Sequence, residues 1–518
     1  MAAIIPSIQT QFQTQWLFPV NSELHHFLIE IHKTAQFSPH VLDSIDADLD
    51  LHGARKKLLR EADQRFNDGQ TADIPGLSIA LRDCKVGDIR LEGGRPRLSA
   101  YVVFLFMMLR GYFGGCKDQD ARQKLEESIT LRHWLGNLGL DLPGASTLSD
   151  NLNAVSNPTR DAIHKAQLRY ILQEKLDDFT TQYIDSTAVK GNTERPTDSG
   201  LISALVARIC RTGQKLDRFG LQNMKVEGLA ELEEEVHHMH KEIGFCSGKP
   251  KSEGKLKKHY HKLLRRAGRA RKRFGRELVE VQDACARNKS LPPSGRLLAQ
   301  EVVSLIGDDI EAIGKVADAC NKRVFLGEKV PVTQKIVSLS DEDAAFIVKG
   351  NWNTEVGYRP QVGRSGNGFV SSLIVPQGNA ADSGQLVDMV VEHWERSTVL
   401  PCKVSVDDGY SSKPAREDLL KTGVEVVSIS GAKGKKITPP EQWKSVAYRD
   451  ARAGRSSVES LIFTLKDGYD FGAMTRRGVE NVYAALMEKI IAYNFIHALR
   501  LRKRRQKEET AMPMAAAA

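Results

Sequence analysis

Three acidic side chains occur where the fold of an α/β sheet could gather them around one site. Asp185 interrupts the apolar, strand-like segment YIDSTAV, Asp407 ends the strand-like segment CKVSVD, and Glu459 lies in the first turn of an expected helix. A carboxylate inside an apolar strand is costly without a partner, and ligand sites in α/β sheets favour the carboxyl ends of strands. Three crowded carboxylates repel one another by several kcal/mol in the absence of a cation. The pattern therefore predicts a divalent metal site of the kind that cleaves phosphodiester bonds.

These acids also have ordinary structural interpretations. A lone Asp in a strand is often an edge or turn residue, and Ser456 with Glu459 forms the S-x-x-E capping-box pattern of a helix start. Arg455, Glu459 and Lys466 fall at helical spacing. That spacing is typical of a surface ion-pair ladder as well as of a helix face that holds a phosphate strand. Periodicity alone leaves both interpretations open.

The elements that would position these residues follow from the hydrophobic pattern. Residues 1–155 are expected to be mostly helical, and residues 179–189 alternate along one face as a strand does. Residues 200–325 are helical and charged again, as an insertion behind that first strand. The later elements are expected in this order: strands at 331–338, 354–363 and 368–375, the last two a hairpin with its turn at RSGNG, a helix at 382–396, a strand at 402–407, a helix from Pro414, a strand at 424–430, a helix near Ser456 and a long final helix. The order predicts a mixed α/β sheet flanked by helices.

The N-terminal region contains the most apolar stretch of the chain. Residues 100–109, AYVVFLFMML, fall far short of the roughly 20 apolar residues that a membrane helix needs, so we expect a buried core helix. Ser146 could cap a short helix that follows, which leaves open either a helix-turn-helix or the ordinary packing of a helical domain. We interpret Asp198, directly before LISALVARI, as a helix N-cap or structural residue.

Composition favours an anionic partner and an intracellular setting. The 518 residues, 41% of them hydrophobic, suffice for roughly two to four domains. Lys and Arg number 74 against 65 Asp and Glu, a formal charge of +9. Seven cysteines are scattered singly without a C-x-x-C pair, so neither a disulfide framework nor a zinc ribbon is expected. We expect no signal peptide and no membrane span, and we interpret the histidines at 237, 238 and 240 as helix-surface residues.

Positive charge is concentrated in the inserted helical region. Residues 249–276 carry thirteen Lys and Arg against one Glu, and apolar residues recur among them at the spacing of an amphipathic helix. We interpret the run as a contact surface for a nucleic-acid phosphate backbone, although such runs often form only a solvated helix face. The acidic run ELEEEV before it could dock against it, and the C-terminal LRLRKRR is a second candidate. The backbone-contact candidates are Lys258, Lys262, Arg265, Arg266, Arg269, Lys272 and Arg273.

Three segments resemble the signature motifs of the DDE transposases of bacterial insertion sequences. RSSVESLIFTLK has the Arg, Glu and Lys spacing of the Tyr-Arg-Glu-Lys signature, and VDDGYSS is similar to the second-Asp motif Asp-x-Gly-Tyr-x-Ser. IDSTAVKGNTERPTDSGLI is similar to the first-Asp motif, in which Asp-x-Thr is followed by Pro-Thr-Asp-Ser. KIVSLSDEDAAFIVKGN and TEVGYRPQV look like the linking strands of that group, and the resemblance covers residues 180–200 and 325–500.

The resemblance implies an RNase H-like fold that cuts DNA strands at transposon ends and joins the freed 3′-hydroxyl to target DNA. It implies that Asp185, Asp407 and Glu459 form a triad that holds two Mg²⁺ or Mn²⁺ ions. It also implies that Arg455 and Lys466 are the basic pair of the signature.

This chain departs from the signature at one position, and its second-Asp motif offers two adjacent acids as the metal ligand. The signature Tyr is replaced by Arg452, which could still contact phosphate. Asp407 and Asp408 cannot both point into one site, because adjacent strand residues face opposite ways. The motif places one residue between the ligand and Gly409, which favours Asp407.

The expected partners are the double-stranded DNA of the terminal inverted repeats and of the target, and a second copy of the chain that brings two ends together. A cytoplasmic, nucleoid-associated protein is expected. The alternatives are an RNase H-like nuclease without strand transfer and a catalytically silent, transposase-derived DNA-binding protein. The expected domains are a helical DNA-end-binding and dimerisation domain at 1–175, an RNase H-like catalytic domain at 176–200 and 326–475, the helical basic insertion at 201–325, and a C-terminal helix and basic tail at 476–518.

Overall fold

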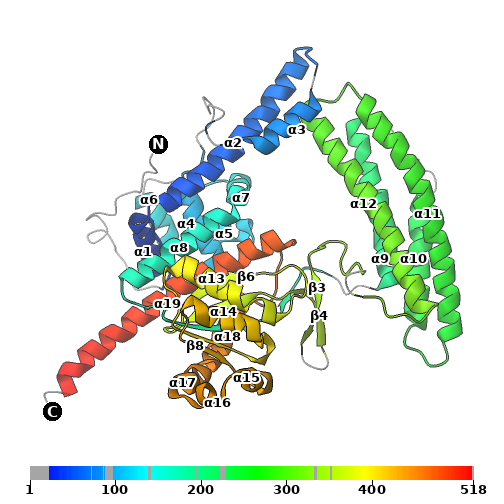
Figure 1. Ribbon diagram of the computed structural model, residues 1–518. Helices are drawn as coiled ribbons and strands as arrows, with labels where there is room; N and C mark the ends of the chain where they lie inside the picture. The colour runs from blue at the N-terminus through cyan, green and yellow to red at the C-terminus, as the bar shows by residue number, and fades with distance from the viewer. Residues whose placement is uncertain are drawn as a thin grey trace. The chain divides into compact units, whose positions relative to one another are not determined.

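The computed structural model describes residues 23–515, apart from 72, 86, 88–96, 138–141, 194–196, 222–228, 332–334 and 350–352 (Figure 1). Contacts within the chain divide it into two compact units, each assembled from separated stretches of sequence. The first unit comprises residues 1–50, 92–192 and 343–518, and the second comprises residues 51–91 and 193–342. Helix α2 (His40–Asn67) contributes residues to both units.

A five-stranded mixed sheet forms the centre of the first unit, in the order β6-β5-β1-β7-β8. β1 pairs with β5 and β5 pairs with β6 in antiparallel fashion, whereas β7 runs parallel to β1 and β8 parallel to β7. The strands are β1 (Thr181–Ser186), β5 (Gln361–Ser365), β6 (Val370–Ile374), β7 (Lys403–Val406) and β8 (Val426–Ile429). The mixed α/β class expected from the sequence is confirmed.

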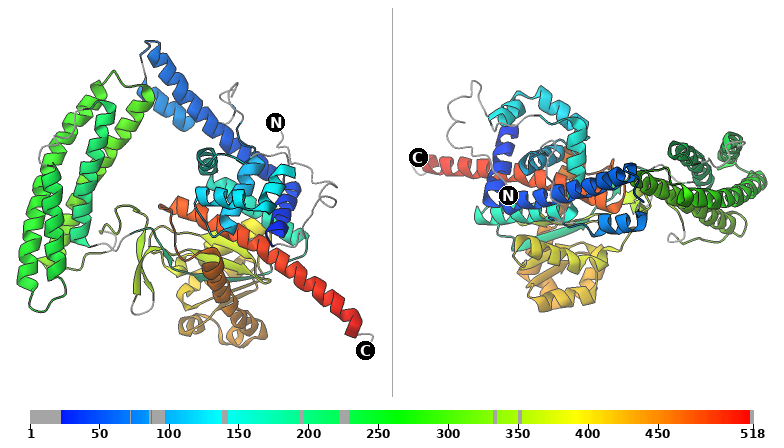
Figure 2. Two further views of the ribbon diagram at one scale, coloured as in Figure 1. Left: turned by 180° about the vertical axis from the view of Figure 1, so that it is seen from behind. Right: turned by 90° about the horizontal axis from the view of Figure 1, so that it is seen from above.

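Helices cover both faces of this sheet (Figure 2). Because side chains alternate along β1, successive residues of this strand contact helices on opposite faces. Ile184 is fully buried in a core that includes residues of α13 (Leu386–Ser397) and α14 (Lys413–Thr422). Its neighbours Tyr183 and Asp185 therefore point to the opposite face. Helices α17 (Val446–Gly454) and α18 (Ser456–Tyr469) pack on that side, and two short helices precede them, α15 (Ala432–Ile437) and α16 (Pro440–Lys444).

A second, smaller sheet follows the first strand. Its order is β2-β4-β3, with both pairs antiparallel, and the strands are β2 (Val189–Lys190), β3 (Ala345–Lys349) and β4 (Asn353–Tyr358). Lys190 also forms a parallel bridge with Ala473, just beyond α18. The bridge ties the segment that follows Asp185 to the end of the helix that carries Glu459.

The N-terminal helices of the first unit pack with the long C-terminal helix α19 (Val479–Ala515). In α4 (Ala100–Tyr112) every residue up to Gly111 is buried, which confirms the expected core helix. A Cβ on Gly111 would lie 2.3 Å from the backbone oxygen of Glu488, so a glycine allows α4 and α19 to approach closely. The other helices of this layer are α1 (Glu23–Phe37), α5 (Asp118–Glu127), α6 (Ile129–Asn137), α7 (Ala145–Ala154) and α8 (Asn157–Gln173).

The second unit is built from long helices that lie side by side (Figure 1). They share one apolar core, to which each contributes a buried stripe. These helices are α9 (Asp198–Lys215), α10 (Leu229–Cys246), α11 (Glu253–Arg287) and α12 (Pro293–Val324), with the shorter α3 (Ile74–Asp83) in contact with α12. Among the described residues of the whole chain, none of the helices is both long and apolar enough to span a membrane.

Two strand expectations were wrong. The first was expected at 331–338. Residues 332–334 lie outside the described residues, and the other residues of that range form no strand. The next strand along the chain is β3, at Ala345–Lys349. The strand expected at 354–363 is two strands, β4 and β5, separated at Arg359 and Pro360. A proline cannot donate to a strand ladder, which explains the break. The hairpin with its turn after β5 is confirmed.

One helix cap differs from expectation, and Asp198 has the structural one of its two expected roles. Helix α7 begins after Gly144, so Ser146 lies inside the helix rather than at its cap. The N-cap of α9 is Thr197, whose hydroxyl accepts a hydrogen bond from Gly200 N–H, and Asp198 is the first helical residue. Asp198 instead pairs with Arg323 at the end of α12, at 2.6 Å. Its role within the second unit is therefore an ion pair between helices.

Candidate active site

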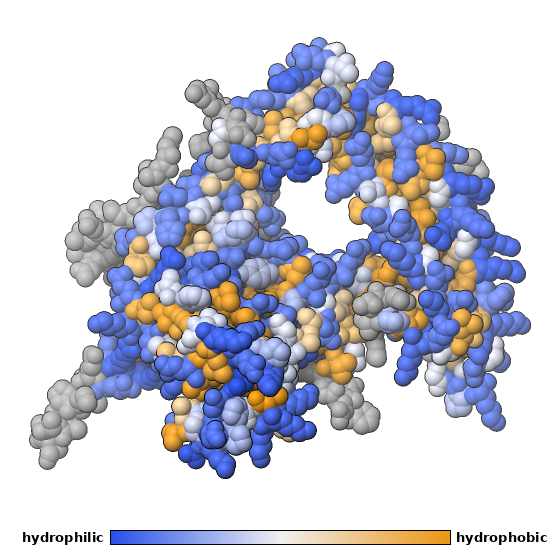
Figure 3. Space-filling model, in the orientation of Figure 1, coloured by the Kyte–Doolittle hydropathy of each residue, from blue (hydrophilic) through white to orange (hydrophobic). Residues whose placement is uncertain are grey.

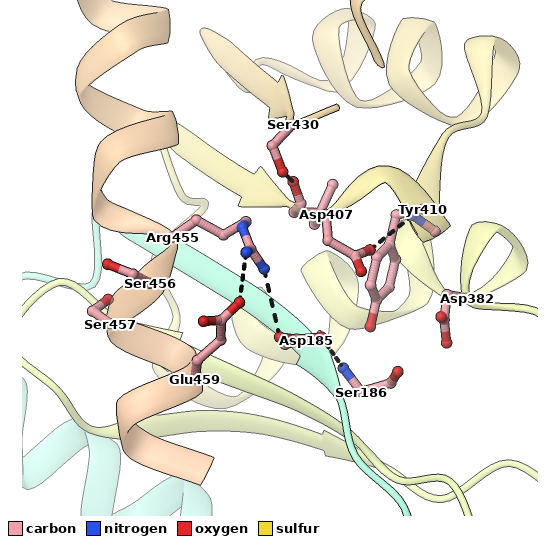
Figure 4. Close-up of polar contacts among 12 residues, drawn as sticks. Asp185, Ser186, Asp382, Asp407, Tyr410, Ser430, Arg455, Ser456, Ser457 and Glu459 are labelled. Carbon is pink, nitrogen blue, oxygen red and sulfur yellow. Dashed lines mark hydrogen bonds and ion pairs between the residues drawn. The ribbon is translucent and has the colours of Figure 1, made fainter. Parts of the chain in front are cut away.

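The register of β1 and β7 sets Asp185 beside Asp407. Tyr183 pairs with Ser405 in these parallel strands. Residues two places further along each strand lie level with one another on the same face, because side chains alternate. Asp185 is the fifth residue of β1, and Asp407 directly follows β7 and caps a short turn of 3₁₀ helix. Figure 4 shows the two carboxylates near the carboxyl ends of neighbouring strands.

Helix α18 brings the third acid, Glu459, to the same face. α18 packs on β1 and β5, and its junction with α17 passes directly over Tyr183. A Cβ on Gly454, at that junction, would lie 2.2 Å from the Tyr183 hydroxyl. The missing side chain therefore allows the helix pair to lie this close to β1.

The capping-box interpretation of Glu459 was wrong. The residue at the N-cap of α18 is Arg455, it has helical backbone angles, and its side chain makes no capping hydrogen bond. Ser456 is already helical, so the helix start does not use the S-x-x-E pattern. Glu459 is 53% exposed, and its carboxylate binds the guanidinium of Arg455.

Arg455 places a positive charge between the acids. Its Nη2 lies 2.5 Å from Oε1 of Glu459, and its Nη1 lies 3.6 Å from Oδ2 of Asp185. Figure 4 shows the guanidinium in the space between Asp185, Asp407 and Glu459. The four side chains, from two strands and one helix, form a single charged cluster.

Burial and a neighbouring acid raise the pKa of both carboxyl groups, Asp185 and Asp407. Burial, and then the charge of Asp407, raise the pKa of Asp185 to about 6, although the N–H of Ser186 donates to its Oδ1 at 2.8 Å. Burial also raises the pKa of Asp407; Asp382 adds to that rise, while Gly409 N–H and Arg455 oppose it. Raised carboxyl pKa values on neighbouring acids mark a site that a further cation would stabilise.

The two adjacent acids of the second motif have different surroundings. Asp408 Oδ1 accepts a hydrogen bond from Gly434 N–H at 2.9 Å, and its Oδ2 accepts one from Lys433 N–H at 3.3 Å. These backbone donors lie at the start of α15, and they lower the pKa of Asp408. The geometry supports the choice of Asp407 as the acid that faces Asp185.

A buried network beside the triad was missed by sequence reasoning. Asp382, which is 6% exposed, binds Arg359 and accepts a hydrogen bond from the Gln361 amide at 3.1 Å. Arg359 also donates to the hydroxyl of Ser186, the residue after Asp185, at 3.1 Å. The hydroxyl of buried Tyr410 donates to Gln361. The network fixes the ends of β1 and β7 relative to each other.

The structure also places the other two basic residues of the signature. The guanidinium of Arg452 lies over the ring of Trp443, 4.8 Å from its centroid. The Nζ of Lys466 donates to the backbone oxygen of Ala188 at 3.1 Å, which joins α18 to the segment after β1. Arg455 contacts two acids of the triad, Asp185 and Glu459.

The donor set fits a hard divalent cation. Carboxylate oxygens are the ligands that Mg²⁺ and Mn²⁺ prefer, and burial together with the charge of Asp407 raises the pKa of Asp185. As the side chains lie, no three Asp, Glu, His or Cys residues within the described ranges are close enough to hold one ion. The guanidinium of Arg455 occupies the space between Asp185 and Glu459. Binding of an ion by all three acids therefore requires Arg455 to turn away.

The seven basic residues expected to contact phosphate all lie on α11, and they fall into two groups. Arg266 pairs with Glu235 of α10 at 2.5 Å, as expected for docking of the acidic run, and Arg273 pairs with Glu277 of α11 itself at 2.8 Å. The other five are exposed: Lys258, Lys262, Arg265, Arg269 and Lys272.

Carboxylates gathered at strand ends and on a covering helix are the type of ligand that metal-dependent phosphodiester chemistry uses. Residues 343–495 match the family model of the transposase DDE domain. That match supports a transposase of the DDE type. It contains Asp407 and Glu459 but not Asp185, which the fold brings to them from outside the matched region. No curated protein and no solved structure matches the chain.

Proposed function

We propose that this protein is a DNA transposase with an RNase H-like core that cuts DNA at transposon ends and joins the freed 3′-hydroxyl to target DNA. The observation that carries the proposal is the convergence of Asp185, Asp407 and Glu459 on one face of the sheet, with the last two inside the matched transposase DDE domain. The five-stranded mixed sheet supports the RNase H-like assignment.

We assign Asp185, Asp407 and Glu459 as the ligands of two Mg²⁺ or Mn²⁺ ions. Bound ions would activate the attacking oxygen and stabilise the leaving one. Asp185 and Asp407 lie on rigid strand ends, whereas Glu459 is more exposed and lies one helical turn from Arg455. Once released from the acids, the guanidinium of Arg455 is long enough to bind a phosphate of the scissile strand.

The fold supports these roles through contacts at a distance from the reacting atoms. Arg359 and Asp382 hold Ser186 and thereby the end of β1. Lys466 anchors α18 to Ala188. We assign both contacts a positioning role, because each holds in place an element that carries one of the acids.

The test is a cleavage and joining reaction. The full chain is incubated with a plasmid that carries the DNA flanking its gene, in Mg²⁺ or Mn²⁺, and nicks and new joints at 3′-hydroxyl ends are mapped. We expect both products, and we expect Asp185→Asn to slow nicking by roughly 10²-fold or more, since metal-assisted stabilisation is worth several kcal/mol. DNA binding by the variant should persist.

The outcomes separate the candidate functions. Nicking without joining would identify a nuclease rather than a transposase. DNA binding without metal-dependent nicking in the wild-type chain would identify a catalytically silent DNA-binding protein. The proposal further assigns residues 1–175 to binding of transposon ends and to pairing of two copies of the chain, which footprinting and sedimentation with end DNA would test.

A further inference from the structure

Helix α11 carries a stripe of seven exposed cations along one face. They recur at intervals of three and four residues, which at 3.6 residues per turn confines them to an arc of about 100° over a length of about 32 Å. We call these residues the α11 stripe: Lys255, Lys258, Lys262, Arg265, Arg269, Lys272 and Arg276. In Figure 3 the side of the second unit that carries α11 is largely hydrophilic.

The stripe points directly away from the core of its own unit. The buried residues of α11 begin with Tyr260, Leu263 and Ala267, and they recur on the side of the helix opposite the stripe. The core of the second unit covers that apolar side. A peripheral membrane helix must insert its apolar side into lipid, and here that side is already occupied. The exposed stripe therefore fits an aqueous polyanion better than a lipid surface.

Nothing within the described part of the chain neutralises the stripe. None of its seven side chains forms an ion pair or hydrogen bond with a described residue, whereas Lys257, Arg266 and Arg287 of the same helix are paired with acids. Between Glu253 and Glu277 the helix has no acidic residue. Like charges three or four residues apart destabilise a helix. An external anion would relieve that repulsion.

We propose that the α11 stripe binds the phosphate backbone of duplex DNA, as a contact surface in the second unit separate from the acidic triad. One turn of duplex DNA is about 34 Å long, so a stripe of ~32 Å spans nearly one turn and can meet the phosphates that face it. Side chains that meet only phosphate bind without regard to base sequence. The inference deepens the proposed function and rests on DNA as the substrate.

The test compares two triple variants that remove the same charge from the same helix. The stripe variant carries Lys262→Gln, Arg265→Gln and Arg269→Gln. The control variant carries Lys257→Gln, Arg266→Gln and Arg287→Gln, whose native side chains are paired with Glu253, Glu235 and Asp283. Glutamine keeps helix propensity close to that of Lys and Arg. Binding of the full-length proteins to a random-sequence duplex is measured over a range of salt concentrations.

DNA binding by the stripe variant should depend less on salt than DNA binding by the wild type. The control variant should keep nearly the wild-type dependence. Each lost phosphate contact lowers the slope of log K against log salt by about 0.9, so the stripe variant should lose about 2.7. The control should stay within about one unit of the wild-type slope. Equal slopes for the two variants would overturn the inference.

Two further measurements separate this inference from its alternatives. Vesicles of phosphatidylserine and phosphatidylcholine serve as the lipid probe, and stripe-dependent binding to them without stripe-dependent binding to the duplex would overturn the inference. Nicking by the wild-type chain at low salt reports on the proposed function independently. If nicking occurs while the two slopes agree, the inference fails and the proposed function stands; if the slopes differ as expected without nicking, the proposed catalysis fails alone.

Discussion

At the active site, Arg455 and a divalent ion would compete for the same carboxylate oxygens. The guanidinium bridges Glu459 and Asp185, so a bound ion must displace it. We expect Arg455→Gln to tighten Mn²⁺ binding by about tenfold, equivalent to ~1.4 kcal/mol, because a competing positive charge is removed. Electron paramagnetic resonance of free Mn²⁺ gives the dissociation constant without a cleavage assay.

The matched control is Arg452→Gln, three residues earlier. Its guanidinium stacks on Trp443 and contacts none of the three acids. It should leave the Mn²⁺ dissociation constant unchanged. If Arg455→Gln also left that constant unchanged or weakened binding, the competition would be refuted.

The three candidate ligands could be predicted at the residue scale because each occurs in a local pattern. Asp185 breaks an apolar strand, Asp407 precedes a turn, and Glu459 follows a basic residue by four positions. Asp382 has no such pattern. Its partners, Arg359 and Gln361, come from the β4–β5 connection and from β5. Only the folded sheet reveals that network.

At the scale of elements, the junction of α17 and α18 sets how closely Glu459 approaches β1. A methyl group at Gly454 would collide with the ring of Tyr183, so we expect Gly454→Ala to move α18 away from the strand. A displacement of about 1 Å at a catalytic group costs as much as 10²-fold in rate. The nicking rate of the variant should fall by about tenfold or more.

Gly468→Ala, within α18 itself, provides the control. A Cβ at Gly468 would meet nothing within 4 Å, and alanine is the better helix former. This variant should nick as fast as the wild type, with slightly higher stability. If Gly454→Ala behaved in the same way, α18 would not depend on that close approach.

The packing of α19 on the N-terminal helices depends on a buried ion cluster. Glu488 accepts hydrogen bonds from Arg110 at 2.8 and 2.6 Å and from Arg160 at 3.0 Å. Burial alone would raise the pKa of Glu488, but the charges of Arg110 and Arg160 outweigh it and hold the pKa at about 2. Glu488→Gln leaves two buried guanidinium groups without their counter-ion and should lower the free energy of unfolding by about 3 kcal/mol or more.

Denaturant unfolding monitored by circular dichroism measures this effect. The control is Glu480→Gln on the same helix, at an exposed position next to Asn157. It should change the free energy of unfolding by no more than about 0.5 kcal/mol. Similar losses in both variants would show that the cluster contributes little beyond a surface pair.

Long periodic elements could be predicted from the sequence, and short or terminal features could not. α11 was expected from its apolar stripe, and the strand around Asp185 from its alternation. The short helices α15 and α16 have too few residues to show a helical period. The sequence left open whether Asp198 caps α9 or has a structural role, because Thr197 and Asp198 are both good cap residues; Thr197 is the cap and Asp198 pairs with Arg323.

At the scale of the whole molecule, buried neutral histidines make the fold sensitive to acid. Burial lowers the pKa of His393 to about 4, and its ring bonds the Ser371 hydroxyl and the Phe179 carbonyl. The unfolded chain binds a proton near pH 6.5, so stability falls as the pH drops below that value and continues to fall until the folded pKa is reached. His164, with a pKa of about 3 because of burial and Arg396, acts in the same direction.

Thermal or denaturant unfolding at pH 7 and pH 5 measures this linkage. Between those values His393 should contribute a loss of about 2 kcal/mol. His393→Gln cannot take up the proton, so it should lose about 2 kcal/mol less than the wild type over the same interval. Parallel losses in the two proteins would mean that His393 is protonated in the folded state.

The division into two units was only partly foreseeable from the sequence. Charged helical periodicity marked an insertion behind the first strand, expected at 201–325. The second unit instead comprises residues 193–342 together with 51–91. The earlier segment joins it through contacts such as that of Ser294 with Asp63, which no local pattern predicts.

Counting bound Mn²⁺ by electron paramagnetic resonance tests the central claim most directly. The full-length wild type should bind two ions per chain, and Asp185→Asn, Asp407→Asn and Glu459→Gln should each reduce that number or weaken the binding. Asp408→Asn is the decisive control, because its carboxylate caps α15 and its loss should leave the ions in place. Equal Mn²⁺ binding in the wild type and all three triad variants, or loss of binding in Asp408→Asn alone, would contradict the account.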